Sequence, residues 1–271
     1  MESIKTIPNR LYLLPHAIFS WFVVLLPPAL YFYFVYSYSL NLPFADDFTN
    51  LSQAISIFQS ANFNEAFSIF FVLENGHRIA FTRLIYILSH ALFGEIDFKI
   101  LVLIGNIPLV VLLYLFFNVL KVPRSNLLYF IPISILLFQL QFWKNMTWAA
   151  TAVHHQYALL FSGLTFYFLS KNSNRYFYSA FFFSVVSVFT HGAGLPTIFL
   201  GWVNLLISKR YRQSLIWIFG TFCFGFFYCK NFFPGTSDLS RAPSLAELKV
   251  GVTYFFAFLG STFSAKVVYE Q

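Results

Sequence analysis

The stretch LYLLPHAIFSWFVVLLPPALYFYFVYSYSL, residues 11–40, decides the class of the fold. It contains no Asp, Glu, Lys or Arg, and it is long enough to cross a bilayer as one helix. Lys5 and Arg10 precede it. The run is longer than the apolar core of a signal peptide, and no small-residue cleavage site follows it. These features predict an uncleaved first transmembrane helix over about 12–38.

The composition of the whole chain points the same way. Hydrophobic residues make up 58% of the chain, charged residues make up 10%, and the mean hydropathy is +0.69. A water-soluble domain carries roughly 25% charged residues, so this chain could not cover itself with a polar surface. The net charge of +7 does not indicate a nucleic-acid partner, because Lys and Arg form short clusters between apolar segments. The sequence therefore predicts an integral membrane protein whose partner is the lipid bilayer.

Further apolar segments follow the first one along the chain. Their lengths predict an all-α fold, a polytopic transmembrane helix bundle of about eight spans, formed as a single domain over 1–271. The predicted spans are about 12–38, 99–120, 127–143, 152–170, 176–191, 193–208, 214–229 and 250–267.

The distribution of Lys and Arg predicts how these spans are oriented in the cell membrane. With the N-terminus in the cytoplasm, three successive short loops place basic clusters on the cytoplasmic side, as the positive-inside rule requires. A span at Ile79–Phe93 would invert all later loops, so we predict that this segment is a helix in the outer interface. An external loop over 41–98 then holds two amphipathic helices, about 47–60 and 77–93, and a second external loop runs over 230–249.

The rare polar residues concentrate on the predicted outer side, where they are candidates for a functional site. Asp46 and Asp47 follow the first span almost directly. The other candidates on this side are Glu74, His77, Arg78, Arg83, His154, His155, Lys230 and Arg241. Four of the six histidines are predicted at this one face, namely His77, His154, His155 and His191.

These groups also have purely structural interpretations. The adjacent aspartates could cap a helix that begins near Phe48, or one of them could have the raised pKa that suits a general base. The run ENGHR, residues 74–78, could be only a turn with a polar helix start. Metal binding by the neighbours His154 and His155 is disfavoured, because adjacent side chains on a helix diverge by about 100° and two ligands are too few. Gly-Ala-Gly at 192–194 predicts a tight turn between helices.

The order of these features resembles the GT-C superfamily of integral membrane glycosyltransferases, which use polyprenyl-phosphate sugars. The resemblance covers about residues 12–120 and is best in RLIYILSHALFG, residues 83–94, followed by Asp97, Phe98 and a long apolar helix. Members of the superfamily have a similar helix ending in Phe-Gly, then a short acidic and aromatic step, then a span. They run longer than this chain, so the resemblance predicts a short or truncated relative.

This resemblance implies the transfer of a sugar from a polyprenyl-phosphate donor to a glycan, lipid or protein acceptor at the extracytoplasmic face. Asp46 or Asp47, in the place of the family's catalytic carboxylate, would act as general base on the acceptor hydroxyl. Arg78 and Arg83 are favoured for the leaving phosphate, since arginine binds phosphate through two hydrogen bonds, and Lys144 is a further cation. The remaining candidates for substrate binding are Glu74, His77, His154, His155, Lys230 and Arg241. A divalent metal on the two aspartates would be compatible with the sequence, which does not demand one.

Two other classes of function remain open. A transporter or flippase of lipid-linked or small polar substrates would also carry rare polar residues, but at mid-membrane depth and often with broken helices or inverted repeats. The centres of the predicted spans are nearly free of charge, which favours a site at the surface. A non-catalytic membrane protein would tolerate replacement of Asp46, Asp47, Arg78 and Arg83.

Overall fold

The fold is known from a computed structural model, which describes residues 10–121, 124–171, 173–229, 249–250 and 253. The chain divides into two compact units, Met1–Tyr228 and Cys229–Gln271. Nearly all of the second unit lies outside the described residues, including the predicted span 250–267 and almost the whole predicted loop 230–249. The single domain over 1–271 therefore stays a prediction.

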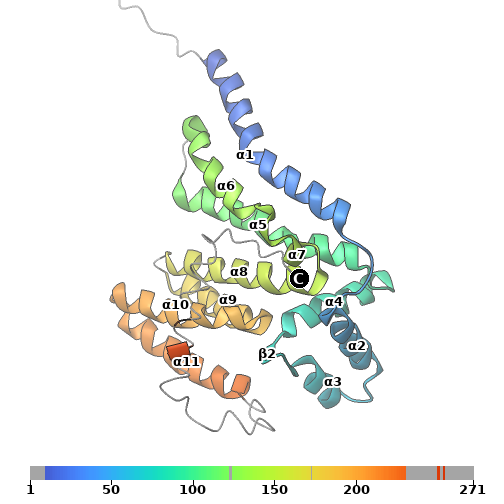
Figure 1. Cartoon of the computed structure of the whole chain (residues 1–271). Helices are drawn as coiled ribbons and strands as arrows, with labels where there is room; N and C mark the ends of the chain where they lie inside the picture. The colour runs from blue at the N-terminus through green and yellow to red at the C-terminus, as the bar shows by residue number, and fades with distance from the viewer. Residues whose placement is uncertain (1–9, 122–123, 172, 230–248, 251–252, 254–271) are drawn as a thin grey trace, which may run out of the picture. The chain divides into compact units, whose positions relative to one another are not determined.

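The first unit is built almost entirely from helices (Figure 1). α1 (Arg10–Tyr38) leads into a segment of shorter elements, after which α5 (Phe98–Leu120) begins a series of packed helices. Asp97 caps α5 by accepting a hydrogen bond from the Ile100 backbone N–H at 3.0 Å. The other helices of the series are η1 (Arg124–Phe130), α6 (Ile131–Leu137), η2 (Leu140–Phe142), α7 (Trp143–Met146), α8 (Ala149–Leu169), α9 (Asn174–Thr190), η3 (Gly192–Gly194), α10 (Leu195–Ile207) and α11 (Tyr211–Cys229).

The segment between α1 and α5 folds into three short helices and a two-stranded hairpin. Its elements are α2 (Asp46–Gln59), α3 (Phe63–Phe70), β1 (Leu73–Glu74), β2 (His77–Arg78) and α4 (Ala80–Phe93). The two predicted amphipathic helices are confirmed as α2 and α4, except that residues 77–78 of the second form strand β2 and the helix begins at Ala80. α3 and the hairpin are additional to the prediction. Asn75 and Gly76, both at positive φ, make the predicted turn as the tight end of the hairpin. The segment closes on itself where the Phe98 backbone N–H donates to the Asn41 side chain at 2.8 Å.

The amphipathic helix α4 turns its polar residues toward the protein. Thr82 and Arg83 are fully buried and Ser89 is nearly so, whereas Leu88 and Leu92 are exposed. A helix of a water-soluble protein would show the opposite arrangement. Exposed leucines opposite a buried polar stripe fit a helix whose outer side meets lipid.

The core of the unit forms where α5 and α9 each pack against α8. Gly105 lets α5 and α8 approach closely, because a Cβ at this position would lie 2.7 Å from the Ala152 Cβ. A cluster of buried apolar residues around Leu101 joins α1, α4, α5 and η1. A second buried cluster surrounds Trp217 of α11, whose indole N–H donates to the Ile198 carbonyl at 3.0 Å.

Three helical stretches of the described residues are long and apolar enough to cross a membrane, and they match the first three predicted spans. These stretches are Ile18–Tyr38, Phe98–Leu120 and Leu127–Met146. The prediction of about eight spans is not supported. α9 and α10 have only 17 and 13 residues. α8 has 21 residues but carries the polar run His154, His155 and Gln156, which lowers its hydropathy.

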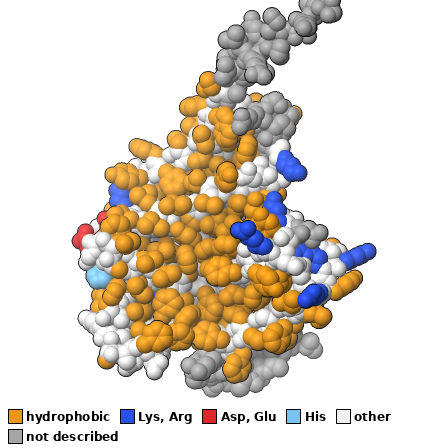
Figure 2. All heavy atoms as spheres, turned by 180° about the vertical axis from the view of Figure 1, so that it is seen from behind, with side chains coloured by type: hydrophobic (Ala, Val, Ile, Leu, Met, Phe, Trp, Pro, Cys, Tyr) orange, Lys and Arg blue, Asp and Glu red, His pale blue; other side chains and the backbone are white. Residues whose placement is uncertain are grey.

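Large hydrophobic side chains cover much of the surface that Figure 2 shows. Among the exposed ones, Phe222 and Phe226 of α11 are 74% and 81% exposed, and Ile207 of α10 is 77% exposed. Exposed apolar area of this extent is costly in water and ordinary against lipid tails. This surface and the three apolar stretches are typical of a membrane protein.

Candidate functional site

Two pockets open beside the first turn of α2 and the first turn of α8. Asp47 and Ala149 line the larger pocket, of about 680 Å³. Asp46 and Thr151 line the smaller pocket, of about 180 Å³. The two helix starts are joined directly, because the Ala150 backbone N–H donates to the Asp47 carboxylate at 2.8 Å. The two predicted aspartates therefore line different pockets, although they are neighbours in the chain.

The Asp47 carboxylate is buried, and both of its oxygens are held by protein donors. It accepts hydrogen bonds from the Tyr86 hydroxyl at 2.6 Å, the Ala150 N–H at 2.8 Å and the Phe44 N–H at 3.0 Å. Burial raises the pKa of Asp47, although these hydrogen bonds act to lower it. The bond to Phe44 fixes the chain just before α2. The predicted role of an aspartate as helix cap is not confirmed, because α2 begins at Asp46 and its N-cap residue is Ala45, with no side-chain hydrogen bond to the helix. Asp47 also joins α2 to α4 and α8.

Asp46 has a different environment from its neighbour. The side chain is half-buried and lines the smaller pocket. Its backbone carbonyl accepts a hydrogen bond from the Asn50 side chain at 2.9 Å. No donor from the described part of the chain binds the Asp46 carboxylate, so this group is available to a ligand in the pocket.

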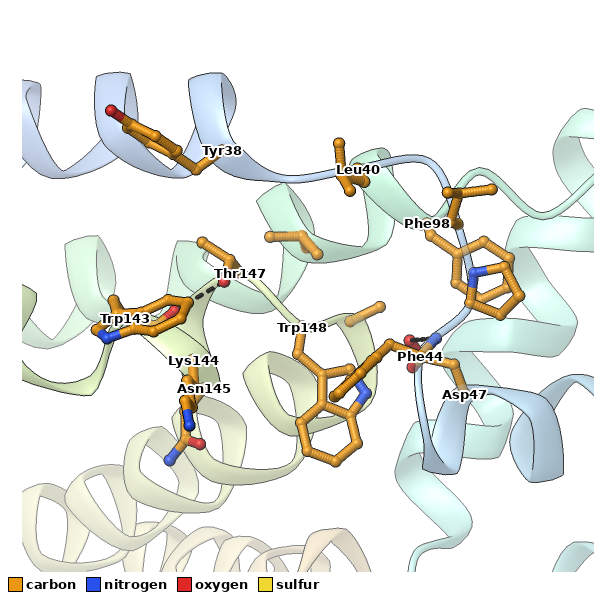
Figure 3. Close-up of a pocket in the computed structure, with 14 residues that line it drawn as sticks. Tyr38, Leu40, Phe44, Asp47, Phe98, Trp143, Lys144, Asn145, Thr147 and Trp148 are labelled. Atoms are coloured by element: carbon orange, nitrogen blue, oxygen red, sulfur yellow. Dashed lines mark hydrogen bonds between the residues drawn. The ribbon is translucent and has the colours of Figure 1, made fainter. Parts of the chain in front are cut away.

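The larger pocket combines aromatic faces with one cation (Figure 3). Phe44 and Trp148 lie next to Asp47, and their ring centroids are 5.2 Å apart. Trp143 and Lys144 of α7 lie farther along the pocket, with the Lys144 Nζ 5.7 Å from the Trp143 ring centroid. Most of the other lining residues are apolar. A ligand with an apolar part and an anionic group would match this lining.

The smaller pocket gathers histidines from distant parts of the chain. They are His77 of β2, His154 and His155 of α8, and His191 between α9 and η3. The His191 ring centroid lies 4.7 Å from those of both His77 and His155. The carboxylate residues Asp46 and Glu74 line the same pocket. The structure thus brings together the four histidines that the sequence predicts at one face.

The tight turn η3, which the sequence predicts, determines where two of these imidazoles lie. The Ala193 backbone N–H donates to the His191 Nδ1 at 3.1 Å. Gly192 packs so closely on the His77 ring that a Cβ at this position would overlap it. His191 is absent from the predicted substrate-binding residues, although the sequence predicts it at the same face as the other three histidines, just before the glycine turn.

We expect Gly192→Ala to push the His77 ring out of the smaller pocket without unfolding the protein, because the new methyl group and the ring cannot share one space. Mass spectrometry after treatment with diethyl pyrocarbonate should show faster modification of His77 in this variant. Gly225→Ala is the matched control, because a Cβ at Gly225 meets nothing within 4 Å. Equal reactivity of His77 in both variants and the wild type would contradict the close packing.

Arg83 is fully buried and its guanidinium is bonded to the protein. It donates to the Phe70 and Val72 carbonyls at 3.0 Å each and pairs with Glu74 at 3.2 Å. A further bond reaches the Gln53 side chain. Burial lowers the pKa of Arg83 to about 10, so the side chain stays charged at neutral pH. Burial also raises the pKa of Glu74 by more than the charge of Arg83 lowers it. Arg83 thereby ties α4 to α2, α3 and the hairpin.

Arg78 is also directed toward backbone carbonyls. It is nearly buried, its Nε donates to the Tyr228 carbonyl at 2.7 Å, and its guanidinium donates to the Phe71 carbonyl. These carbonyls lie at the C-terminal ends of α11 and α3, where a positive charge is favourable. Neither Arg78 nor Arg83 lines the two pockets. The cation that does so is Lys144.

The predicted option of a metal on the two aspartates does not fit this arrangement. The Asp47 oxygens already accept hydrogen bonds from three protein donors, so they are poorly placed to ligate a cation as well. Within the described residues, no group of three or more His, Cys, Asp or Glu side chains is arranged to hold a metal ion. Lys230 and Arg241, the remaining predicted cations, lie outside the described residues.

Comparisons with protein-family models, with curated proteins and with solved structures found no match to this chain. A function for the chain has to follow from its two pockets and from the features of its sequence. The pockets supply three elements of chemistry. These are a free carboxylate, a cation in an aromatic and apolar pocket, and a set of imidazoles in a polar pocket.

Proposed function

We propose that this chain is a membrane glycosyltransferase, which moves a sugar from a polyprenyl-phosphate donor to an acceptor hydroxyl. One observation carries the proposal: the adjacent carboxylates Asp46 and Asp47 line two pockets of opposite character. The larger pocket is apolar and aromatic and contains Lys144, as a lipid phosphate requires. The smaller pocket is polar, and no Lys or Arg is among its lining residues. With the donor in the apolar pocket and the acceptor in the polar one, a carboxylate of the polar pocket would serve as general base for sugar transfer.

Asp46 is the better placed general base, because its carboxylate is available in the polar pocket. The acceptor hydroxyl gives its proton to Asp46 while its oxygen attacks the anomeric carbon of the donor sugar. The bond between that carbon and the phosphate oxygen breaks, and the polyprenyl phosphate leaves with the bonding electron pair. Lys144 stabilises the negative charge that develops on the phosphate. Asp47 acts as a positioning residue, since its bonds hold α2 against α4 and α8.

The orientation that we propose follows the positive-inside rule, with the N-terminus in the cytoplasm and both pockets at the extracytoplasmic face. α8 and α11 have 21 and 19 residues, which is enough to cross the bilayer alongside the three most apolar stretches. The predicted total of about eight spans would also include the shorter α9 and α10 and the segment 250–267, nearly all of which lies outside the described residues.

Lys144→Gln tests the donor pocket. Transfer should fall about tenfold to a hundredfold, because a hydrogen bond to a charged group contributes about 1.5–3 kcal/mol. Transfer is measured as the release of polyprenyl phosphate from a polyprenyl-phosphate sugar in proteoliposomes. Lys99→Gln is the matched control, because Lys99 packs 3.9 Å from the Tyr36 ring centroid and lines neither pocket. An equal effect of the two substitutions would remove the support for the larger pocket as the donor site.

A further inference from the structure

A buried nitrogen without a hydrogen-bond partner marks the smaller pocket as a binding site. His154 lines this pocket and is only 6% exposed. Its Nε2 has no hydrogen-bond partner among the described residues. Buried polar atoms of native proteins are almost always paired. The ring that carries this unpaired nitrogen also lines the pocket, which points to a ligand there.

The hydrogen bonds at the rim of the pocket decide what two other imidazoles offer to that ligand. His191 accepts the Ala193 N–H at Nδ1, so its ring is neutral, carries its proton on Nε2 and offers a donor. The His155 Nδ1 lies 3.0 Å from the Thr151 carbonyl. A carbonyl can only accept, so this Nδ1 donates and the Nε2 of His155 is left as an acceptor.

A hydroxyl group matches this pair of imidazoles, because it can donate to one ring and accept from the other. A metal ion does not match, since it needs a lone pair from each ring and the remaining nitrogen of His191 carries a proton. The charges of the pocket exclude an anionic ligand. Asp46 and Glu74 line it, and no Lys or Arg does. Glu74 is paired with Arg83 at 3.2 Å, which leaves Asp46 to accept a hydrogen bond from the ligand.

We infer that the smaller pocket binds a neutral, hydroxyl-rich group, namely one sugar unit. Its volume of about 180 Å³ suits a single compact group, since pockets for larger ligands span roughly 300–1,000 Å³. If the proposed function holds, this sugar is the acceptor, and the acceptor class is a glycan. Only the role as acceptor rests on the proposed function; the binding of a hydroxyl-rich group does not.

The test uses the purified full chain in detergent and the methyl glycosides of glucose, galactose, mannose and N-acetylglucosamine as probes. At least one glycoside should raise the midpoint of thermal unfolding of the wild type, because it binds only the folded state. His154→Phe should abolish this rise. His90→Phe is the matched control and should keep it, because His90 packs against the Phe58 ring and does not line the pocket. His155→Gln provides the same test if His154→Phe does not fold.

Two results would overturn the inference. One is that no glycoside raises the unfolding midpoint of the wild type, or that each glycoside raises it by the same amount in the wild type and in His154→Phe. The other is that Zn²⁺ raises it through His154 while the glycosides do not. Release of polyprenyl phosphate from polyprenyl-phosphate sugars is measured on the same variants, which separates the two proposals. Glycoside binding through His154 without any donor consumption supports the sugar pocket and counts against the glycosyltransferase. Donor consumption at equal rates in the wild type and His154→Phe supports the glycosyltransferase and counts against the sugar pocket.

Discussion

Asp46→Asn is expected to reduce sugar transfer by about 10²–10⁴-fold, the usual contribution of a general base. The asparagine keeps the shape of the side chain but cannot take the proton of the acceptor hydroxyl. Because no donor from the described residues binds the Asp46 carboxylate, the thermal unfolding midpoint should stay at the wild-type value. Both quantities are measured on the same detergent-purified protein, with transfer followed after reconstitution into proteoliposomes.

Asp47→Asn is the informative comparison, because the two residues are neighbours with opposite roles. An amide in place of the Asp47 carboxylate would turn an NH₂ group toward a donor, such as the Phe44 or Ala150 N–H. Leaving a buried donor unsatisfied costs about 1–3 kcal/mol, so this variant should unfold at a lower temperature. The assignment of the base would be wrong if Asp46→Asn transferred sugar at the wild-type rate, or if Asp47→Asn lost transfer with an unchanged unfolding midpoint.

Arg83→Met should lower the free energy of unfolding by about 3–5 kcal/mol, as expected when one partner of a buried ion pair is removed. Methionine fills a similar volume but leaves Glu74 without its counter-ion. The carbonyls of Phe70 and Val72 also lose their donor. The readout is thermal unfolding in detergent. Limited proteolysis shows which part of the protein is destabilised, because the segment between α1 and α5 should become the first site of cleavage.

Arg175→Met controls for the loss of a positive charge, because Arg175 is exposed at the start of α9. It should change stability by no more than about 0.5 kcal/mol. The double variant Arg83→Met with Glu74→Gln should recover part of the lost stability, since it no longer leaves a carboxylate without a partner. A fully stable Arg83→Met variant that no longer transfers sugar would instead favour a role of Arg83 in phosphate binding.

The long apolar elements and the gathering of polar residues can be predicted from the sequence. α5 has 23 residues, of which Lys99 alone is charged, and such a run identifies a helix wherever it packs. The predicted topology places the four histidines of the smaller pocket at one face, because alternate loops of a membrane protein share one side. The predicted number of spans was not supported because of the shorter apolar segments. The length of such a segment does not distinguish a membrane span from a helix buried in the protein.

The roles of single charged residues could not be predicted, because they depend on contacts distant in the chain. Asp46 and Asp47 look equivalent in the sequence. They differ because Tyr86 and Ala150, 39 and 103 residues after Asp47, both reach the Asp47 carboxylate. Arginine is equally suited to phosphate and to backbone carbonyls. The partners of Arg83 are set by where α3 ends, and α3 is not evident from the sequence.

The most direct test of sugar transfer is to incubate the reconstituted wild-type chain with a panel of polyprenyl-phosphate sugars and to measure polyprenyl phosphate together with glycosylated product. We predict that the wild type consumes at least one donor and forms the product in equal amount, and that equally folded Asp46→Asn does not. Folded wild type that consumes no donor in the panel, or that moves the intact donor across the membrane without cleaving it, would contradict the assignment as a glycosyltransferase.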